Sequence, residues 1–153
     1  MRTSRLFGLP LLALALIATS SPAQNGKIDF SGGWYLQKER SEPSDIGGRF
    51  ASLKLVVLQE QDDIAIDRTY NSFAVYENLT LDGTESPSEF RSSPRLSRAS
   101  WSADGQNLII AAKTIFRRRG NEFEVITTEI WNLREGGQVL SIEYASKPRG
   151  HLQ

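Results

Sequence analysis

The sequence predicts an all-β protein, an antiparallel up-and-down meander of about eight to nine strands closed into a barrel. Apolar and polar residues alternate with period two in one segment after another. Residues that favour tight turns stand between these segments. After residue 23, no segment keeps a helical period over a dozen residues. A barrel is favoured over a sandwich because closure removes the two edges of a long meander.

The first 23 residues are predicted to be a signal peptide rather than part of the fold. Arg2 and Arg5 precede the apolar run Leu6–Ile17, and Ser21-Pro22-Ala23 offers a small-residue cleavage site. A run of about a dozen residues is short for a membrane span, which takes about 20. We therefore expect residues 24–153 to be exported, periplasmic or extracellular, with no transmembrane span after cleavage. The alternative is an uncleaved anchor.

The predicted strands follow one another along residues 24–153. They are Phe30–Lys38, Ser52–Glu60, Ile64–Tyr70, Phe73–Leu81, Glu89–Arg91, Arg95–Ser102, Asn107–Phe116, Glu122–Asn132 and Gln138–Ser146. Turn signals separate many of them, at Gln61-Asp62-Asp63, Asn71-Ser72, Asp82-Gly83, Asp104-Gly105, Gly120-Asn121 and Gly136-Gly137. Alternation places these side chains inward: Leu53, Leu55, Val57, Gln59, Leu108, Ile110, Ala112, Thr114 and Phe116. A barrel of about eight strands is either filled by its side chains or holds one small ligand.

The composition excludes most catalytic chemistry. The chain has no cysteine, and its one histidine, His151, lies three residues from the C-terminus. There is no Gly-rich phosphate loop, no Gly-x-Ser-x-Gly turn and no metal-ligand spacing. We predict no catalytic residues, no metal, no cofactor and no enzymatic activity; a buried Glu77 or Glu129 acting as a general base is the alternative.

Short motifs in the chain resemble those of the calycins, the lipocalin and fatty-acid-binding barrels. Phe30-Ser31-Gly32-Gly33-Trp34 is similar to their first strand, and Leu81-Asp82-Gly83 and Trp101-Ser102-Ala103-Asp104-Gly105 are similar to their hairpins. Thr127-Thr128-Glu129-Ile130-Trp131 resembles a late strand of exported bacterial lipocalin-like domains. The resemblance implies a lipocalin-like barrel closed at one end by Trp34. The Arg-x-Tyr carboxylate clamp of fatty-acid-binding proteins is replaced by Ile142-Glu143-Tyr144.

Inward-facing charges are the sharpest local signal. Arg68 shares a face with Tyr70, and Glu77 shares one with Val75 and Leu79. With a two-residue turn at Asn71-Ser72, Arg68 and Glu77 are diagonal neighbours. Buried charges must be paired, so these side chains either satisfy each other or meet a ligand.

The candidate ligand-binding residues are therefore Arg68, Tyr70, Glu77 and Glu129. The inward face of the strand that carries Glu129 is not decided, because Phe123, Val125 and Trp131 compete with Ile126 and Ile130 for it.

Charge is unevenly distributed along the chain. The 18 basic and 18 acidic residues balance, but residues 24–90 are acidic and residues 91–119 are basic. Neighbouring strands are neighbours in space, so we predict one basic surface, made of Arg91, Arg95, Arg98, Arg117, Arg118 and Arg119. After cleavage the chain has 16 basic and 18 acidic residues, and nucleic-acid motifs are absent, so nucleic acid is not an expected partner.

Two functions remain open. The first is a monomeric carrier of a small apolar or anionic amphipathic ligand inside the barrel, with Arg68 orienting the head group. The second is a non-enzymatic envelope interaction or inhibitor module with a filled barrel that presents its basic surface to a partner. A cavity above about 300 Å³ reached by Arg68 would favour the first function. A filled interior with exposed aromatic residues near Arg117–Arg119 would favour the second.

Overall fold

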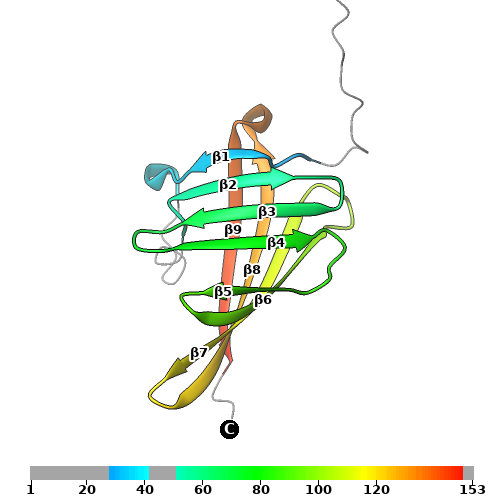
Figure 1. The fold of residues 1–153 in the computed structure, drawn as a ribbon. Coiled ribbons are helices and arrows are strands. Elements are labelled where there is room, and N and C mark those ends of the chain that lie inside the picture. The colour runs from blue at the N-terminus through cyan, green and yellow to red at the C-terminus, as the bar shows by residue number, and fades with distance from the viewer. Residues whose placement is uncertain (1–27, 42–50, 150–153) are drawn as a thin grey trace, which may run out of the picture.

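The structure is a computed structural model that describes residues 28–41 and 51–149 (Figure 1). The predicted signal peptide and its cleavage site lie outside the described residues. Nine strands and two short 3-10 turns follow one another along the described chain. In order they are β1 (Gly32–Tyr35), η1 (Lys38–Arg40), β2 (Lys54–Gln59), β3 (Asp63–Thr69), β4 (Ala74–Thr80), β5 (Ser86–Phe90), β6 (Ser93–Trp101), β7 (Leu108–Arg118), β8 (Asn121–Arg134), η3 (Glu135–Gly137) and β9 (Val139–Arg149).

Each predicted strand corresponds to one observed strand, which confirms the all-β prediction. The largest shift at a strand start is in β5, which begins at Ser86 rather than Glu89. The added residues include Pro87, which is unfavourable within a sheet because proline cannot donate to a ladder. The structure accommodates Pro87 because β5 is an edge strand of its sheet, where one side needs no partner.

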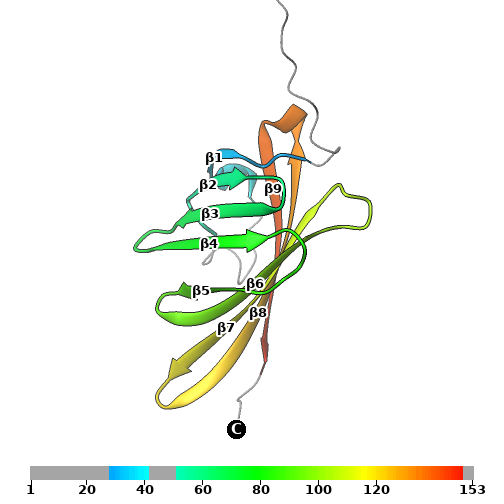
Figure 2. The same cartoon turned by 45° about the vertical axis from the view of Figure 1, so that its right-hand side comes forward.

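The strands form two antiparallel sheets in which every sequential neighbour within a sheet is paired. The first sheet has the order β1-β2-β3-β4, and the second has the order β5-β6-β7-β8-β9. The predicted meander is thus confirmed. Closure into a barrel is not seen as a continuous ladder: in the described part of the chain, an isolated bridge between Asp82 and Ser100 connects the sheets. Figures 1 and 2 show β1–β4 crossing β7–β9 at a steep angle, so the two sheets enclose a space between them.

Two corners hold the sheets together. At the first, the chain leaves β4 and runs beside β6, where the Gly83 amide donates to the Ala99 carbonyl at 2.9 Å. At the second, Arg40 next to β1 forms an ion pair with Glu135 in the β8–β9 connection.

The first corner uses a turn that recurs later in the chain. Asp82 Oδ1 accepts from the Thr80 hydroxyl at 2.7 Å and from the Thr84 amide at 2.9 Å. Asp104 Oδ1 accepts in the same way from Ser102 and from the Gln106 amide. The glycine after each aspartate has a positive φ, 85° at Gly83 and 70° at Gly105. Both Asp-Gly turns that the sequence predicts are thus formed, but Asp82-Gly83 is a corner between the sheets rather than a hairpin, because β4 and β5 belong to different sheets.

Apolar side chains fill one part of the space between the sheets. Ile64 and Ile66 from the first sheet meet Leu108, Ile110 and Trp131 from the second, and all five are at most 1% exposed. Around them the inward-facing residues predicted on β2 and β7 are buried or half-buried, as expected. In the described ranges, no helix is long and apolar enough to cross a membrane.

Candidate functional site

Arg68 and Glu77 meet inside the molecule as the register predicts. The Asn71-Ser72 turn is closed by the Tyr70 amide, which donates to the Phe73 carbonyl at 2.9 Å. Arg68 then lies opposite Val75, and its Nε donates to Glu77 Oε2 at 3.0 Å. Arg68 is 4% exposed and Glu77 is 1% exposed. The two strands therefore place a buried ion pair between the sheets.

Arg95 corrects the sequence analysis, which assigned it to the basic surface. It is buried because β6 alternates inward at Arg95, Ser97 and Ala99. Its Nε donates to Glu77 Oε1 at 2.9 Å, and its Nη1 donates to the Thr114 hydroxyl at 3.2 Å. The Ser97 hydroxyl donates to the same Glu77 oxygen at 2.6 Å. The alternation of Ser97 and Ala99 against the outward Arg98 is the sequence signal that could have placed Arg95 inside.

Glu129 is the second carboxylate of this group, and the structure places it inward. Arg68 Nη2 and Trp131 Nε1 both donate to Glu129 Oε2, at 3.0 Å and 2.7 Å. The Arg68 guanidinium also lies 5.5 Å from the centroid of the Trp131 ring, a cation–π contact. Trp131 is fully buried and packs in the core. The predicted strand ended one residue beyond Trp131, whereas β8 continues to Arg134.

We call these residues the charge network: Arg68, Glu77, Arg95 and Glu129, with Ser97, Thr114 and Trp131 as neutral partners. It joins two arginines to two glutamates, so its formal charge is balanced. Burial acts to raise the pKa of Glu77, but the positive charges of Arg68 and Arg95 outweigh it and hold that pKa at about 2. Burial acts to lower the pKa of Arg68, and the Glu129 and Glu77 carboxylates more than reverse this. Glu77 and Arg68 are therefore charged at neutral pH.

Beyond the charge network lies what we call the hairpin end, formed by the β3–β4, β5–β6 and β7–β8 turns. Aromatic rings contact one another across it in a continuous row. The ring centroids are 4.4 Å apart for Tyr70–Phe73, 5.2 Å for Phe73–Phe90, 6.2 Å for Phe90–Phe116 and 5.4 Å for Phe116–Phe123. Tyr70, a candidate ligand-binding residue, belongs to this row. Burial raises the pKa of its hydroxyl, which therefore stays neutral and able to donate at physiological pH.

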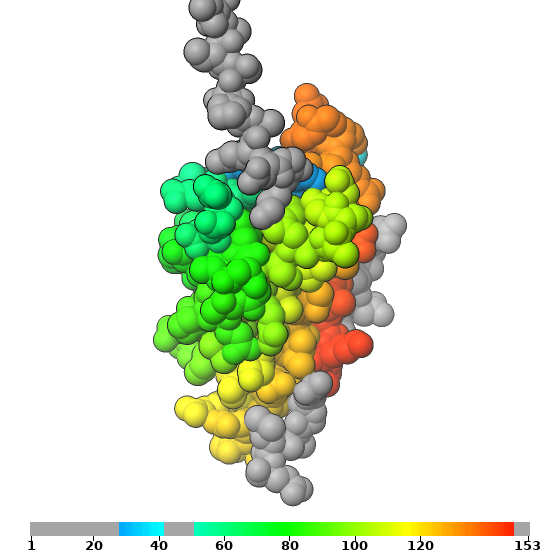
Figure 3. All heavy atoms as spheres, turned by 90° about the vertical axis from the view of Figure 1, so that its right-hand side faces the viewer, coloured from blue at the N-terminus to red at the C-terminus, as the bar shows by residue number. Residues whose placement is uncertain are grey.

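Several inward-facing side chains at the hairpin end are only half-buried, although Phe90 in the middle of the row is buried. Phe116 and Phe123 are partly exposed, in contrast to Leu108 and Trp131 further along the same two strands. The cause is the length of β7 and β8: their ladder runs on to Arg118↔Asn121, well past the last β6–β7 pair, Arg95↔Thr114. In Figure 3 this hairpin, yellow to orange, extends beyond the green strands at one end of the molecule. The second sheet thus presents apolar inner surface that the first sheet does not fully cover.

Two of the predicted surface arginines are held by acidic neighbours. Arg98 faces outward and pairs with Glu85 at 2.9 Å, and Arg117 pairs with Glu122 at 2.5 Å. Arg98 therefore lies on the outer face of the second sheet, away from the hairpin end.

The other three surface arginines lie at two turns of the hairpin end. The Arg91 guanidinium is 4.3 Å from the centroid of the Phe73 ring. Arg118 and Arg119 are exposed at the β7–β8 turn and form no ion pair with the residues that the structure describes. The predicted single basic surface is thus divided among the interior, the outer face and the hairpin end.

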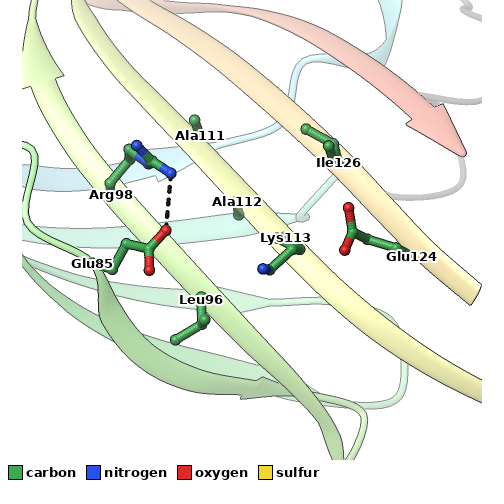
Figure 4. A pocket seen from close by; sticks show the side chains of 8 residues that line it. All are labelled: Glu85, Leu96, Arg98, Ala111, Ala112, Lys113, Glu124 and Ile126. Carbon is green, nitrogen blue, oxygen red and sulfur yellow. Dashed lines mark hydrogen bonds and ion pairs between the residues drawn. The ribbon is translucent and has the colours of Figure 1, made fainter. Parts of the chain in front are cut away.

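Two hollows mark the surface of the second sheet. One, of about 440 Å³, lies at the hairpin end and is lined by Arg118, Arg119, Asn121 and Phe123. The other, of about 430 Å³, lies on the outer face of the sheet (Figure 4). It is lined by Glu85, Leu96, Arg98, Ala111, Ala112, Lys113, Glu124 and Ile126. Neither hollow is lined by Arg68 or Glu77, whose charged groups face each other and the rest of the network.

Trp34, predicted to close the barrel, is half-buried against the apolar core. Its indole nitrogen donates to the Phe30 carbonyl at 3.0 Å. The fully buried Phe30 ring in turn contacts Trp131 edge-on at 5.9 Å and stacks on Trp101 at 6.0 Å. Four aromatic side chains thus pack together on the core side of the charge network.

In the part of the chain that the structure describes, no group of three histidine or acidic side chains is arranged to hold a metal ion. Comparisons of the chain with protein-family models, with curated proteins and with solved structures found no match.

Proposed function

We propose that this chain is an exported, lipocalin-like binding protein that takes up a small hydrophobic or amphipathic ligand at its hairpin end. One observation carries the proposal: aromatic side chains that face inward, continuous with the core, are left partly exposed there. Ligand sites are usually concave and mostly apolar, with a few polar groups placed among apolar ones. Tyr70 and the nearby arginines supply such polar groups.

The charge network has a different role in this proposal from the one expected for Arg68. Its arginines and glutamates already neutralise each other, and a head group bound to Arg68 would have to break the pairs with Glu77 and Glu129 at 3.0 Å. We therefore assign Arg68, Glu77 and Glu129 the self-satisfied role that the sequence left as the alternative. The network is the floor of the site, and the ligand lies above it, against the aromatic row.

Burial of apolar ligand surface supplies the affinity. Each methylene removed from water contributes about 0.8 kcal/mol, so a ligand that buries six contributes about 5 kcal/mol before the costs of binding. The aromatic row offers a rigid surface for this contact because its rings already pack against one another.

We further propose that the two sheets act as one lipocalin-like barrel, and that the protein binds ligand as a monomer without catalysing a reaction. The corners at Gly83 and at Arg40–Glu135 support barrel-like closure, since they join the sheets where no ladder does. Arg2 and Arg5, the apolar run that follows them and the small residues at Ser21-Pro22-Ala23 support export.

A second candidate is the interaction module with a filled barrel. The described residues match the signature expected for it: the core is filled, and Phe123 is partly exposed beside Arg118 and Arg119, whereas neither hollow is lined by Arg68. The two candidates make opposite predictions about small neutral ligands, which the module has no reason to bind.

The test is titration of residues 24–153 with N-phenyl-1-naphthylamine, a neutral dye whose fluorescence rises in apolar surroundings. We expect saturable binding that Phe116→Ser and Phe123→Ser each weaken by about tenfold, the loss of one aromatic contact of about 1.4 kcal/mol. Leu58→Ser is the matched control, because Leu58 is 60% exposed on the outer face of the first sheet. Failure of the wild-type protein to bind the dye would instead favour the interaction module.

A further inference from the structure

Two hairpin turns at the hairpin end share an unusual backbone. The loop between β5 and β6 consists of Arg91 and Ser92, with φ values of 50° and 62°. The loop between β7 and β8 consists of Arg119 and Gly120, with φ values of 52° and 80°. A two-residue loop with positive φ at both positions has the pattern of a type I′ turn. An arginine therefore stands at the first turn position in both hairpins.

Arginine is a poor residue for that position. Type I′ turns favour asparagine, aspartate and glycine, because other side chains clash with the backbone when φ is positive. Strained backbone of this kind is concentrated at functional sites, where the side chain is needed for something other than stability. That both turns carry the same unfavourable and cationic residue points to a shared role for the two side chains.

The two arginines lie on the same end of the molecule and beside the same aromatic row. The β6–β7 pairing ends at Arg95↔Thr114, and the two turns follow on the same side of that last pair, at Arg91 and beyond Arg118. The Arg91 guanidinium lies over Phe73, and Arg118 and Arg119 line the 440 Å³ hollow with Phe123. Each turn thus places a cation at the border of apolar surface, which is the arrangement an amphiphile requires.

The charges at the turns are also available. In the described chain, Arg91, Arg118 and Arg119 have no carboxylate partner, whereas the neighbouring Arg117 is paired with Glu122 at 2.5 Å. Arg68 and Arg95, by contrast, are saturated inside the charge network. At the hairpin end, the described arginines able to receive an external anion are therefore those at the turns.

We propose that Arg91 and Arg119, assisted by Arg118, bind the anionic head group of an amphipathic ligand whose apolar body lies on the aromatic row. The head group is a carboxylate, sulfonate or phosphate, because guanidinium groups match these planar or tetrahedral oxyanions. This inference rests on the proposed function and adds the chemical class of the ligand and the residues that select it.

The experiment compares two probes that share an anilinonaphthalene body. 8-Anilino-1-naphthalenesulfonate is anionic, and N-phenyl-1-naphthylamine is its neutral counterpart. The test variant is Arg91→Asn together with Arg119→Asn, since asparagine suits a positive φ and should keep or raise the urea midpoint of unfolding. The control variant is Lys54→Gln together with Arg98→Gln, which removes two positive charges from outer faces of the sheets.

We expect the dissociation constant of the anionic probe to rise about 3- to 10-fold in the test variant, as for two exposed charge contacts. The neutral probe should change by less than twofold, and the control variant should bind both probes like the wild type. Competition by sodium sulfate, corrected for ionic strength with sodium chloride, should be weak because sulfate lacks an apolar body.

Other results overturn specific parts of the inference. The arginines do not bind a head group if the test variant keeps the wild-type affinity for the anionic probe, or if it loses affinity equally for both probes. Displacement by millimolar sulfate would mean a site for free anions rather than amphiphiles. Absence of neutral-probe binding to the wild type would refute the proposed function itself, and the inference with it.

Discussion

Glu77→Gln tests whether the charge network is the electrostatic centre of the fold. The substitution preserves the shape of the side chain but leaves two buried arginines facing one carboxylate. Arg68 and Arg95 both donate to Glu77, at 3.0 Å and 2.9 Å, and Glu77 is 1% exposed. Removing one partner of a buried pair typically costs 3–5 kcal/mol, because the remaining charge is uncompensated. We expect a loss of about 3–5 kcal/mol in the free energy of unfolding at pH 7.

The pH dependence provides an independent signature of the same group. The pKa of Glu77 is about 2 in the folded protein against an ordinary value of 4.5, so folding favours its charged form. A depressed pKa contributes stability that is present above pH 4.5 and is lost as the pH falls toward 2. The difference corresponds to about 3 kcal/mol. The difference in the free energy of unfolding between wild type and Glu77→Gln should therefore become smaller as the pH falls from 5 to 2.5.

Urea unfolding followed by tryptophan fluorescence measures both effects, since Trp131 is buried against the network. Glu85→Gln is the control, because the Glu85–Arg98 pair is about half exposed and should contribute at most 1 kcal/mol. If Glu77→Gln does not fold, Glu77→Gln with Arg95→Gln restores charge balance and should recover part of the loss. The reasoning would be refuted if Glu77→Gln lowered the free energy of unfolding by less than about 1 kcal/mol at pH 7. It would also be refuted if the difference from wild type did not change with pH.

Three further predictions concern single positions in the chain. Trp131→Phe removes the indole donor to Glu129 at 2.7 Å and some buried volume, so the free energy of unfolding should fall by about 2–4 kcal/mol. Urea unfolding followed by circular dichroism measures this loss. A loss below about 1 kcal/mol would contradict the contact. Gly83→Ala should cost about 1 kcal/mol in the same assay, because φ is 85° there, whereas Gly33→Ala has open space and no such strain. N-terminal sequencing of the exported protein should begin at residue 24, and an intact leader would refute cleavage after Ala23.

Alternation and turn chemistry predicted the elements of this fold because each is local in sequence. The Asn71-Ser72 turn sets the β3–β4 register, and that register alone brings Arg68 to Glu77. The prediction for Glu129 was undecided because β8 carries apolar residues on both faces, and tertiary packing selected the face of Trp131.

Contacts between distant strands were not predictable in the same way. Arg95 was counted as surface because it lies in a basic stretch of sequence, but its partner Glu77 is 18 positions away, on another sheet. The sum of charge along a segment says nothing about which side chains alternate inward. Barrel closure was predicted because it removes sheet edges, but it depends on how two sheets meet, and in the described chain an isolated bridge rather than a continuous ladder joins them.

The charge network also explains how a chain with little hydrogen bonding between its sheets can hold a defined site. Apolar contacts are non-directional, and replacing a buried ion pair by well-packed apolar residues often costs nothing in stability. Ion pairs with several hydrogen bonds fix distance and angle, and here they run from β3 and β4 to β6 and β8 across the space between the sheets. Tyr70 directly follows β3 and Phe123 lies in β8, both on the hairpin side of the network. We therefore propose that fixing the sheets at the network also fixes the width of the proposed ligand site above it, and that the buried charges act on binding through geometry rather than by touching the ligand.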